Sequence, residues 1–189
     1  VVDTYSGAIH AVDEIAYDLI AEFETTEKEA LIEKLLKKYE NIPEATREEL
    51  LQRIDEAGIC GMGGAGFPTV VKLSPPPTKR CEYLILNGAE CEPYLTADFR
   101  LMLERADRIR AGVEIMRKIL GHPAVRIAVE ANKPEAVVAL EKAFADIEGN
   151  VEIVILPVLY PQGSEKHQIY ATVGRIVPEP PQLPIDVGC

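Results

Sequence analysis

Basic side chains are scarce in this chain. It carries 20 lysines and arginines against 31 aspartates and glutamates, which gives a formal net charge of −11. Proteins that bind nucleic acid present a basic surface to the phosphate backbone, so this balance argues against a nucleic-acid partner. Small ligands and other proteins remain as candidate partners.

Long apolar runs are also missing. No stretch approaches the roughly 18 consecutive apolar residues that a membrane-spanning helix needs, and the chain does not open on a basic segment followed by an apolar one. We therefore expect no direct insertion into a membrane. With 189 residues, of which 47% are hydrophobic, the chain can bury a sizeable core.

Cysteine pairs with metal-ligand spacing are absent. The cysteines at positions 60, 81, 91 and 189 include no pair with the two-residue spacing of zinc or iron–sulfur ligands. We expect no metal site among them, and reduced thiols in a cytosolic protein. Because the chain opens on Val1 and stops at Cys189 without a terminating helix or polar tail, we also expect it to be a piece of a longer protein.

The most distinctive segment is a glycine-rich loop that contains Gly61, Gly63, Gly64 and Gly66. Glycine permits positive φ and lets the backbone approach a ligand closely, as a phosphate or pyrophosphate cradle requires. The spacing also fits the dinucleotide fingerprint, which needs a strand before the glycines. Residues 46–58 instead predict a helix, with a capping box formed by Thr46 and Glu49. A ligand-binding loop outside the ordinary Rossmann context is favoured over a helix C-cap followed by a turn.

From residue 80 onward, apolar strands alternate with helices. Strands are predicted over 83–86, 125–129 and 151–156, and the helices between them over 95–120, as one helix or two, and 133–147. Strands that are apolar on both faces and joined by helical crossovers indicate a parallel β-sheet with helices on both faces. The fold class is therefore α/β and Rossmann-like, with N-terminal helices and a partial β appendage.

This pattern suggests three regions. Residues 1–25 would be the remnant of an upstream β domain, residues 26–60 a helical lead-in, and residues 61–189 the α/β ligand-binding domain. In open α/β sheets, ligands collect beyond the carboxyl ends of the strands. Polar segments follow the three strands there, at 87–93, 130–133 and 159–166. We expect residues 87–92 and 160–166 to line one cleft with the glycine loop.

Four segments, taken in order, resemble one known family. They are Gly61-Met62-Gly63-Gly64-Ala65-Gly66-Phe67-Pro68-Thr69 with Lys72, residues 87–96, residues 132–136, and Tyr160-Pro161-Gln162-Gly163 with Glu165 and Lys166. They closely resemble the C subunit of the Rnf electron-transport complex (the RnfC-like family), and more distantly the flavin-carrying, NADH-oxidising subunit of respiratory complex I. Sister branches tied to cobalamin reductases and amino-acid reductases share these motifs.

The resemblance implies an electron-input domain in which a bound flavin carries the chemistry. FMN and NAD(H) would be its cofactors, and electrons would pass to [4Fe-4S] clusters in a region beyond residue 189. Other subunits of a membrane-associated redox complex would be its partners, at the cytoplasmic face of the membrane. Because a further flavin-contacting loop would also follow residue 189, we expect the isolated chain to bind FMN weakly and to be inactive.

By the same resemblance, the cofactor-binding residues would be Gly61, Gly63, Gly64, Gly66, Phe67, Lys72, Asn87, Glu90, Glu92, Tyr160, Gly163, Glu165 and Lys166. Lys72 would offer a cation to the anionic ligand, Asn87 would hydrogen-bond the flavin ribityl chain, and Glu90 would face the hydroxyls of NADH.

Three positions depart from the complex I pattern. Met62, Ala89 and Ser164 stand where that subunit has arginine, aspartate and glutamate. A flavin-free scaffold that contributes only protein contacts is therefore an alternative, as is an electron-transfer partner of a cobalamin or amino-acid reductase. A nucleotide-dependent transferase is disfavoured, because Phe67 and Pro68 occupy the place of a phosphate-loop Lys-Ser/Thr pair.

Overall fold

The computed structural model describes residues 44–61, 66–147, 149–179 and 182–189. The chain divides into two units, Val1–Leu73 and Ser74–Cys189. The β remnant expected at 1–25 lies outside the described residues, and so do Gly63 and Gly64 of the glycine loop.

In the first unit, helix α3 (Arg47–Glu56) begins with the predicted capping box. The Thr46 hydroxyl accepts a hydrogen bond from the Glu49 N–H at 3.2 Å, and the Glu49 carboxylate accepts one from the Thr46 N–H at 2.7 Å. These bonds satisfy two of the N–H groups that a helix start leaves without intrahelical partners. The chain leaves the helix through Gly58, whose φ is 62°, and a single helical turn, α4 (Thr69–Lys72), follows the glycine loop.

The second unit is built on a parallel sheet. Strands β1 (Tyr83–Gly88), β2 (Ala124–Glu130) and β3 (Val151–Leu156) lie in the order β1-β2-β3, and both neighbouring pairs are parallel. The predicted arrangement of the three strands is confirmed.

Four α-helices accompany this sheet. Helices α5 (Ala97–Glu104) and α6 (Ala106–Leu120) connect β1 to β2, and α7 (Pro134–Phe144) connects β2 to β3. Helix α8 (Glu165–Val173) follows β3, and a short 3-10 turn, η1 (Pro184–Val187), precedes the end of the chain. The segment predicted at 95–120 is thus two helices, and the helix predicted at 133–147 is shorter than expected.

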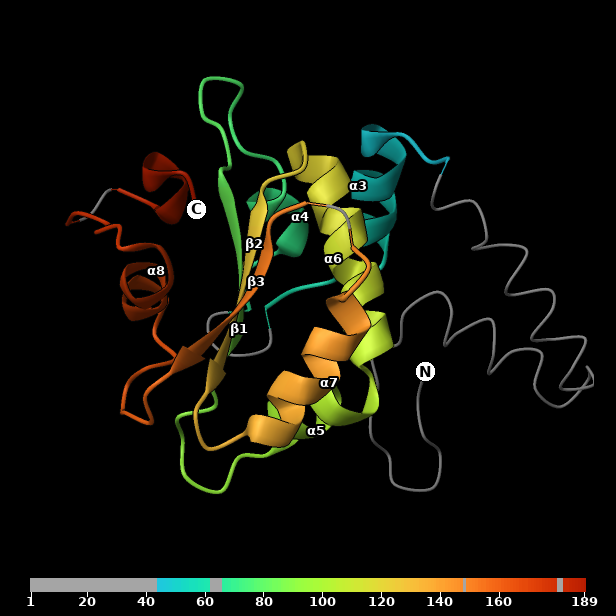
Figure 1. Cartoon of the computed structure of the whole chain (residues 1–189). Coiled ribbons are helices and arrows are strands. Elements are labelled where there is room, and N and C mark those ends of the chain that lie inside the picture. The colour runs from blue at the N-terminus through green and yellow to red at the C-terminus, as the bar shows by residue number, and fades with distance from the viewer. Residues whose placement is uncertain (1–43, 62–65, 148, 180–181) are drawn as a thin grey trace, which may run out of the picture. The chain divides into compact units, whose positions relative to one another are not determined.

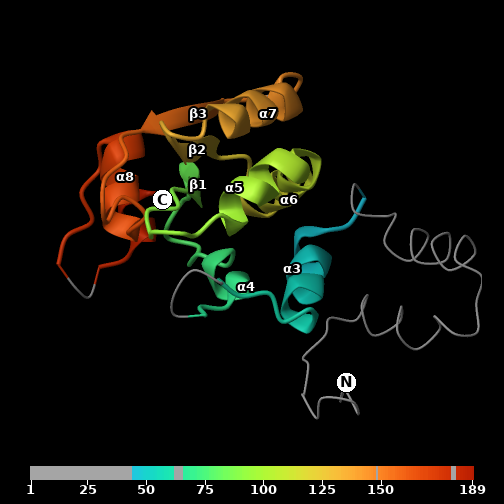
Figure 2. The same ribbon diagram turned by 90° about the horizontal axis from the view of Figure 1, so that it is seen from below.

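The helices cover both faces of the sheet, as predicted. Figures 1 and 2 show α5, α6 and α7 on one face and α8 on the other. On the first face, Val125 and Ile127 of β2 pack with Val113 of α6 and Leu140 of α7 in the main core. Ala128 of β2 belongs to a second cluster with Leu156 of β3. Burying an aliphatic side chain of valine or leucine size contributes roughly 1.5–3 kcal/mol. None of the described helices has the length and apolar character needed to cross a bilayer.

Candidate functional site

A pocket opens at the carboxyl edge of the sheet in the second unit. Its volume is about 500 Å³, and the loops that follow β1, β2 and β3 all contribute to it. Its lining consists of residues 90–96, Phe99, Glu130, Asn132, Lys133 and residues 158–160. This is the edge at which parallel α/β sheets bind their ligands.

The loops after β1 and β3 are in direct contact beside this pocket. The Asn87 side-chain amide donates to the Gly163 carbonyl at 2.7 Å, and its oxygen accepts from the Ala89 N–H at 3.1 Å. The Gly163 N–H donates to Cys91 Sγ at 3.4 Å. A Cβ atom on Gly163 would stand 2.8 Å from the Ala89 carbonyl oxygen, so this close approach requires glycine.

A buried cluster of three charged side chains contributes to the pocket lining. The Glu90 side chain is 2% exposed, Glu130 1% and Lys133 10%. Lys133 Nζ donates to Glu130 Oε2 at 2.6 Å and lies 3.8 Å from Glu90 Oε2. The Glu90 carboxylate also accepts from the backbone N–H groups of Asp98 and Phe99, at 2.9 and 3.4 Å. Buried charges persist only where such partners compensate their lost hydration.

One oxygen in this cluster lacks a partner. Glu130 Oε1 is buried and accepts no hydrogen bond from any described residue. Buried polar atoms are almost always satisfied by protein, by water or by a ligand. A buried water molecule would supply the missing donor. Two other polar groups of the pocket lining, the carboxylate of Glu92 and the side-chain amide of Asn132, are of the kind that hydrogen-bond hydroxyl and amide groups of a nucleotide cofactor.

The surroundings of the cluster favour protonation of a neighbouring acid. Burial, and then the charge of Glu90, raise the pKa of Asp98 in the first turn of α5. Glu92 acts in the same direction, and Lys133 opposes it. The pocket therefore lies in an acidic environment with one buried cation.

Several of the predicted residues lie at or beside this pocket. Glu90, Glu92 and Tyr160 line it, and Tyr160 is exposed. Glu165 and Lys166 lie in the first turn of α8 and are not among the lining residues, and Lys166 Nζ donates to the Pro178 carbonyl at 3.2 Å.

The described part of the glycine loop belongs to the first unit. Its base is closed by hydrogen bonds from the Gly61 N–H to the Phe67 carbonyl and from the Thr69 N–H to the Ile59 carbonyl, both 2.9 Å. Gly66 has a φ of 64°, and Lys72 is exposed with its Nζ 5.9 Å from the centre of the Phe67 ring. Because Gly58 already supplies the left-handed residue after α3, capping that helix does not account for the loop glycines. A single cleft shared by the loop and the pocket stays a prediction.

Glu130 and Lys133 are not among the cofactor-binding residues predicted from the sequence. The strand-end rule marked residues 130–133 as a candidate segment, but a glutamate and a lysine in a turn are typical of ordinary surface residues. The available signal was a glutamate directly after the three apolar residues at 127–129, in a strand expected to be buried on both faces.

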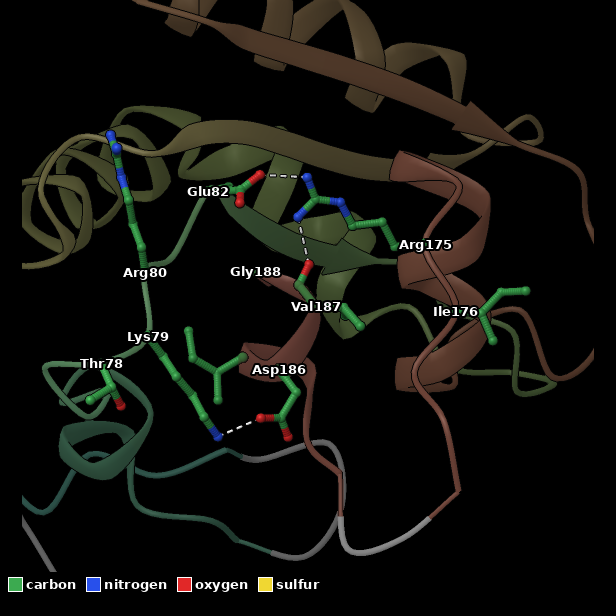
Figure 3. Close-up of a pocket in the computed structure, with 10 residues that line it drawn as sticks. Thr78, Lys79, Arg80, Glu82, Arg175, Ile176, Asp186, Val187 and Gly188 are labelled. Atoms are coloured by element: carbon green, nitrogen blue, oxygen red, sulfur yellow. Dashed lines mark hydrogen bonds and ion pairs between the residues drawn. The ribbon is translucent and has the colours of Figure 1, made fainter.

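A second pocket, of about 540 Å³, lies near the start of β1 (Figure 3). Arg175 donates to Glu82 Oε2 and to the Val187 carbonyl, and Lys79 forms an ion pair with Asp186. These bonds hold η1 against the segment that leads into β1. The two carboxylates there already have cationic partners, so this pocket is a weaker ligand candidate than the one at the carboxyl edge.

Comparisons with known proteins identify the family of this chain. Residues 54–189 match the model of the Nuo51 FMN-binding domain. The chain is 53% identical over 148 residues to the C subunit of the proton-translocating ferredoxin:NAD(+) oxidoreductase complex of Clostridium ljungdahlii, covering 78% of this chain and 32% of that protein. It is 47% identical over 139 residues to the C subunit of the ion-translocating oxidoreductase complex of Pseudomonas aeruginosa, covering 74% of this chain and 18% of that protein.

A solved structure shares the fold. The crystal structure of an NAD+-reducing [NiFe]-hydrogenase in the air-oxidized state matches 95% of this chain and 32% of its own chain, with a TM-score of 0.59 and 23% sequence identity. The matches span about a third or less of the two curated relatives.

Proposed function

Because the chain belongs to the family of Nuo51 FMN-binding domains, we propose that it binds FMN and NAD(H) and exchanges electrons between them. It would do so as the electron-input domain of a Rnf-type ferredoxin:NAD oxidoreductase, the class named in its curated relatives. The pocket at the carboxyl edge carries this proposal, because the loops after all three strands build it at the edge where parallel α/β sheets bind their ligands.

The flavin supplies the chemistry when bound, since it takes a hydride from a nicotinamide and releases electrons singly. The residues of this chain bind and orient. The backbone at Gly61 and Gly66, with Gly63 and Gly64 between them, would lie against the cofactor, beside Phe67. Lys72 is exposed and would neutralise part of the phosphate charge.

The loops of the second unit would also contact the cofactors. Asn87 and Gly163 would contact the FMN. The NAD(H) would lie beside Glu90, Glu92 and Tyr160. Carboxylates accept hydrogen bonds from ribose hydroxyls, and an exposed tyrosine ring offers a face for stacking. Glu165 and Lys166, at the start of α8, would act nearer the nicotinamide.

Electrons would leave this domain for [4Fe-4S] clusters carried elsewhere in the protein. Other subunits of the ion-translocating complex would be its partners, at the cytoplasmic face of the membrane. The curated relatives are themselves subunits of such complexes.

The test is a titration of the complete protein with FMN, followed by flavin fluorescence, with NADH oxidation by an artificial acceptor as the second readout. Lys72→Met should weaken FMN binding by about tenfold or more, because a charge-assisted hydrogen bond contributes roughly 1.5–3 kcal/mol. Lys142→Met, which removes an exposed lysine from α7, is the matched control and should bind FMN as the wild type does. Absence of FMN binding by the wild-type protein would reject the proposal in favour of a flavin-free scaffold.

A further inference from the structure

We propose that Glu130 and Lys133 are positioning residues that hold the Glu90 carboxylate at the start of α5 and thereby fix the pocket wall formed by residues 91–96. The expected effect on NADH binding rests on the proposed function, in which that pocket takes the dinucleotide. The ordering of residues 91–96 by this cluster rests on the contacts alone.

Glu90 joins the two ends of the loop that forms this wall. Its backbone lies where the chain leaves β1, and its carboxylate accepts hydrogen bonds from the N–H groups of Asp98 and Phe99 in the first turn of α5. Residues 91–96 lie between these points, and all of them line the pocket. A carboxylate at a helix N-terminus also interacts favourably with the helix dipole. Glu90 therefore sets the span of the loop.

The loop has few other constraints among the described residues. Cys91 Sγ accepts from the Gly163 N–H at 3.4 Å, and the Leu95 N–H donates to the Glu92 carbonyl at 3.4 Å. Tyr94, in the middle, is fully exposed and has a φ of 67°, a conformation that L-residues rarely adopt. Loss of the Glu90 contacts would therefore leave residues 92–96 weakly held.

Lys133 holds Glu90 in position, and Glu130 in turn holds the Lys133 side chain. Lys133 Nζ lies 3.8 Å from Glu90 Oε2 and 3.5 Å from the Glu90 carbonyl oxygen, so it contacts both ends of that residue. A lysine side chain has many rotamers, and the 2.6 Å bond to Glu130 Oε2 selects one of them. Glu130 is the last residue of β2 and is almost fully buried. The order of the loop after β1 thus depends on a pair carried by the neighbouring strand and its turn.

The first test uses an intrinsic reporter. The chain contains no tryptophan, so Tyr94→Trp introduces a single indole fluorophore at an exposed point of the loop. In this background, Lys133→Met combined with Glu130→Gln removes one positive and one negative charge together. We expect lower tryptophan anisotropy and stronger quenching by acrylamide, with unchanged far-UV circular dichroism. Lys133→Arg, which keeps the cation, should retain most of the anisotropy of the parent reporter protein.

The matched control removes a different ion pair from the same region. Arg100→Gln with Glu104→Gln deletes an exposed pair on α5 and should leave the anisotropy of the introduced tryptophan unchanged. Unchanged anisotropy in the Lys133/Glu130 double variant would overturn the proposal. If the double variant does not fold, the anisotropy is measured for Glu130→Gln alone. Lower anisotropy supports the proposal, and unchanged anisotropy overturns it.

The second test separates positioning from general stability. In the complete protein, the double variant should raise the KM for NADH by about tenfold while kcat at saturating NADH stays within about twofold, because the residues act through the pocket wall and not on the reacting atoms. A fall in kcat with unchanged KM would contradict the positioning role. Failure of the wild-type protein to oxidise NADH would instead count against the proposed function and leave the anisotropy result to decide whether the cluster orders residues 91–96.

Discussion

Asn87 and Gly163, which are 76 positions apart in the sequence, meet through a 2.7 Å hydrogen bond from the Asn87 side-chain amide to the Gly163 carbonyl. Asn87 lies near the end of β1, and Gly163 lies just before α8. The bond joins the loops after the first and third strands, both of which line the pocket at the carboxyl edge. The loops after β1 and β3, both predicted from the sequence to contact a ligand, are therefore joined by a hydrogen bond.

The first prediction concerns this bond. Asn87→Ala should lower the free energy of unfolding by about 1 kcal/mol, because it removes the bonds to Gly163 and Ala89 from a largely exposed side chain. Asn87→Asp keeps an acceptor for the Ala89 N–H but loses the donor to Gly163. Urea denaturation of the two variants measures the separate contributions. If Asn87→Asp is as stable as the wild type, the bond to Gly163 does not hold the loops together.

A second prediction addresses the close approach at Gly163. Gly163→Ala would bring a methyl group to 2.8 Å from the Ala89 carbonyl oxygen and 3.3 Å from Cys91 Sγ, so the two loops must separate. We expect a loss of about 1–3 kcal/mol in thermal denaturation. Gly112→Ala, inside α6 with no atom within 4 Å of the added methyl, is the control and should stabilise by up to about 1 kcal/mol. Equal melting temperatures for Gly163→Ala and the wild type would show that the loops adapt.

Much of the fold could be predicted because local patterns determine it. The strands are mostly apolar, with Arg126 inside β2 and Glu152 inside β3 as charged exceptions, and hydrophobic burial on both faces of a parallel sheet favours such segments. Thr46 and Glu49 form a capping box because their spacing matches one helical turn. The break at Arg105 between α5 and α6 was not located, since no proline or glycine marks it.

The charged cluster could not be predicted, because it depends on how the strands align. Gly88 of β1 pairs with Val129 of β2, and this register brings the loop that starts at Ala89 beside the turn at 131–133. Only then do Glu90, Glu130 and Lys133 meet in a buried place. In the sequence alone, glutamate and lysine favour the surface, and nothing about 130 and 133 indicates a partner some 40 positions earlier.

A third prediction concerns Asp186 in the pocket near the start of β1 (Figure 3). A hydrogen bond from the Leu183 N–H at 2.7 Å, followed by the ion pair with Lys79, holds the pKa of Asp186 below its ordinary value of 3.8. A carboxylate with a lowered pKa stabilises the folded state above its unfolded pKa, and this stability is lost as the pH falls through the folded pKa. Asp186→Asn should therefore lower the urea midpoint at neutral pH, and the difference should shrink in acid. A difference that is the same at neutral and strongly acidic pH would contradict this origin.

The last prediction concerns the reactivity of Cys81. Burial, and then the neighbouring Cys189, raise the pKa of the Cys81 thiol to about 11, although a hydrogen bond with the backbone of Tyr83 acts in the opposite direction. Only the thiolate is alkylated, so the folded chain should react with iodoacetamide at Cys81 more than about 100-fold more slowly than the urea-unfolded chain near neutral pH, where a free thiol has a pKa of about 8.5. Mass spectrometry of the alkylated peptide against time measures both rates.

The pH dependence distinguishes a raised pKa from simple shielding. With a raised pKa, the rate at folded Cys81 should keep rising by about tenfold per pH unit well beyond the point at which the unfolded rate levels off, because the thiolate fraction is still growing. Shielding alone would lower the rate at every pH and leave both curves with the same midpoint. Cys81→Ser identifies the signal as that of this thiol. A folded-state curve that levels off near a pH of about 8.5 would show that the surroundings of Cys81 do not disfavour its thiolate.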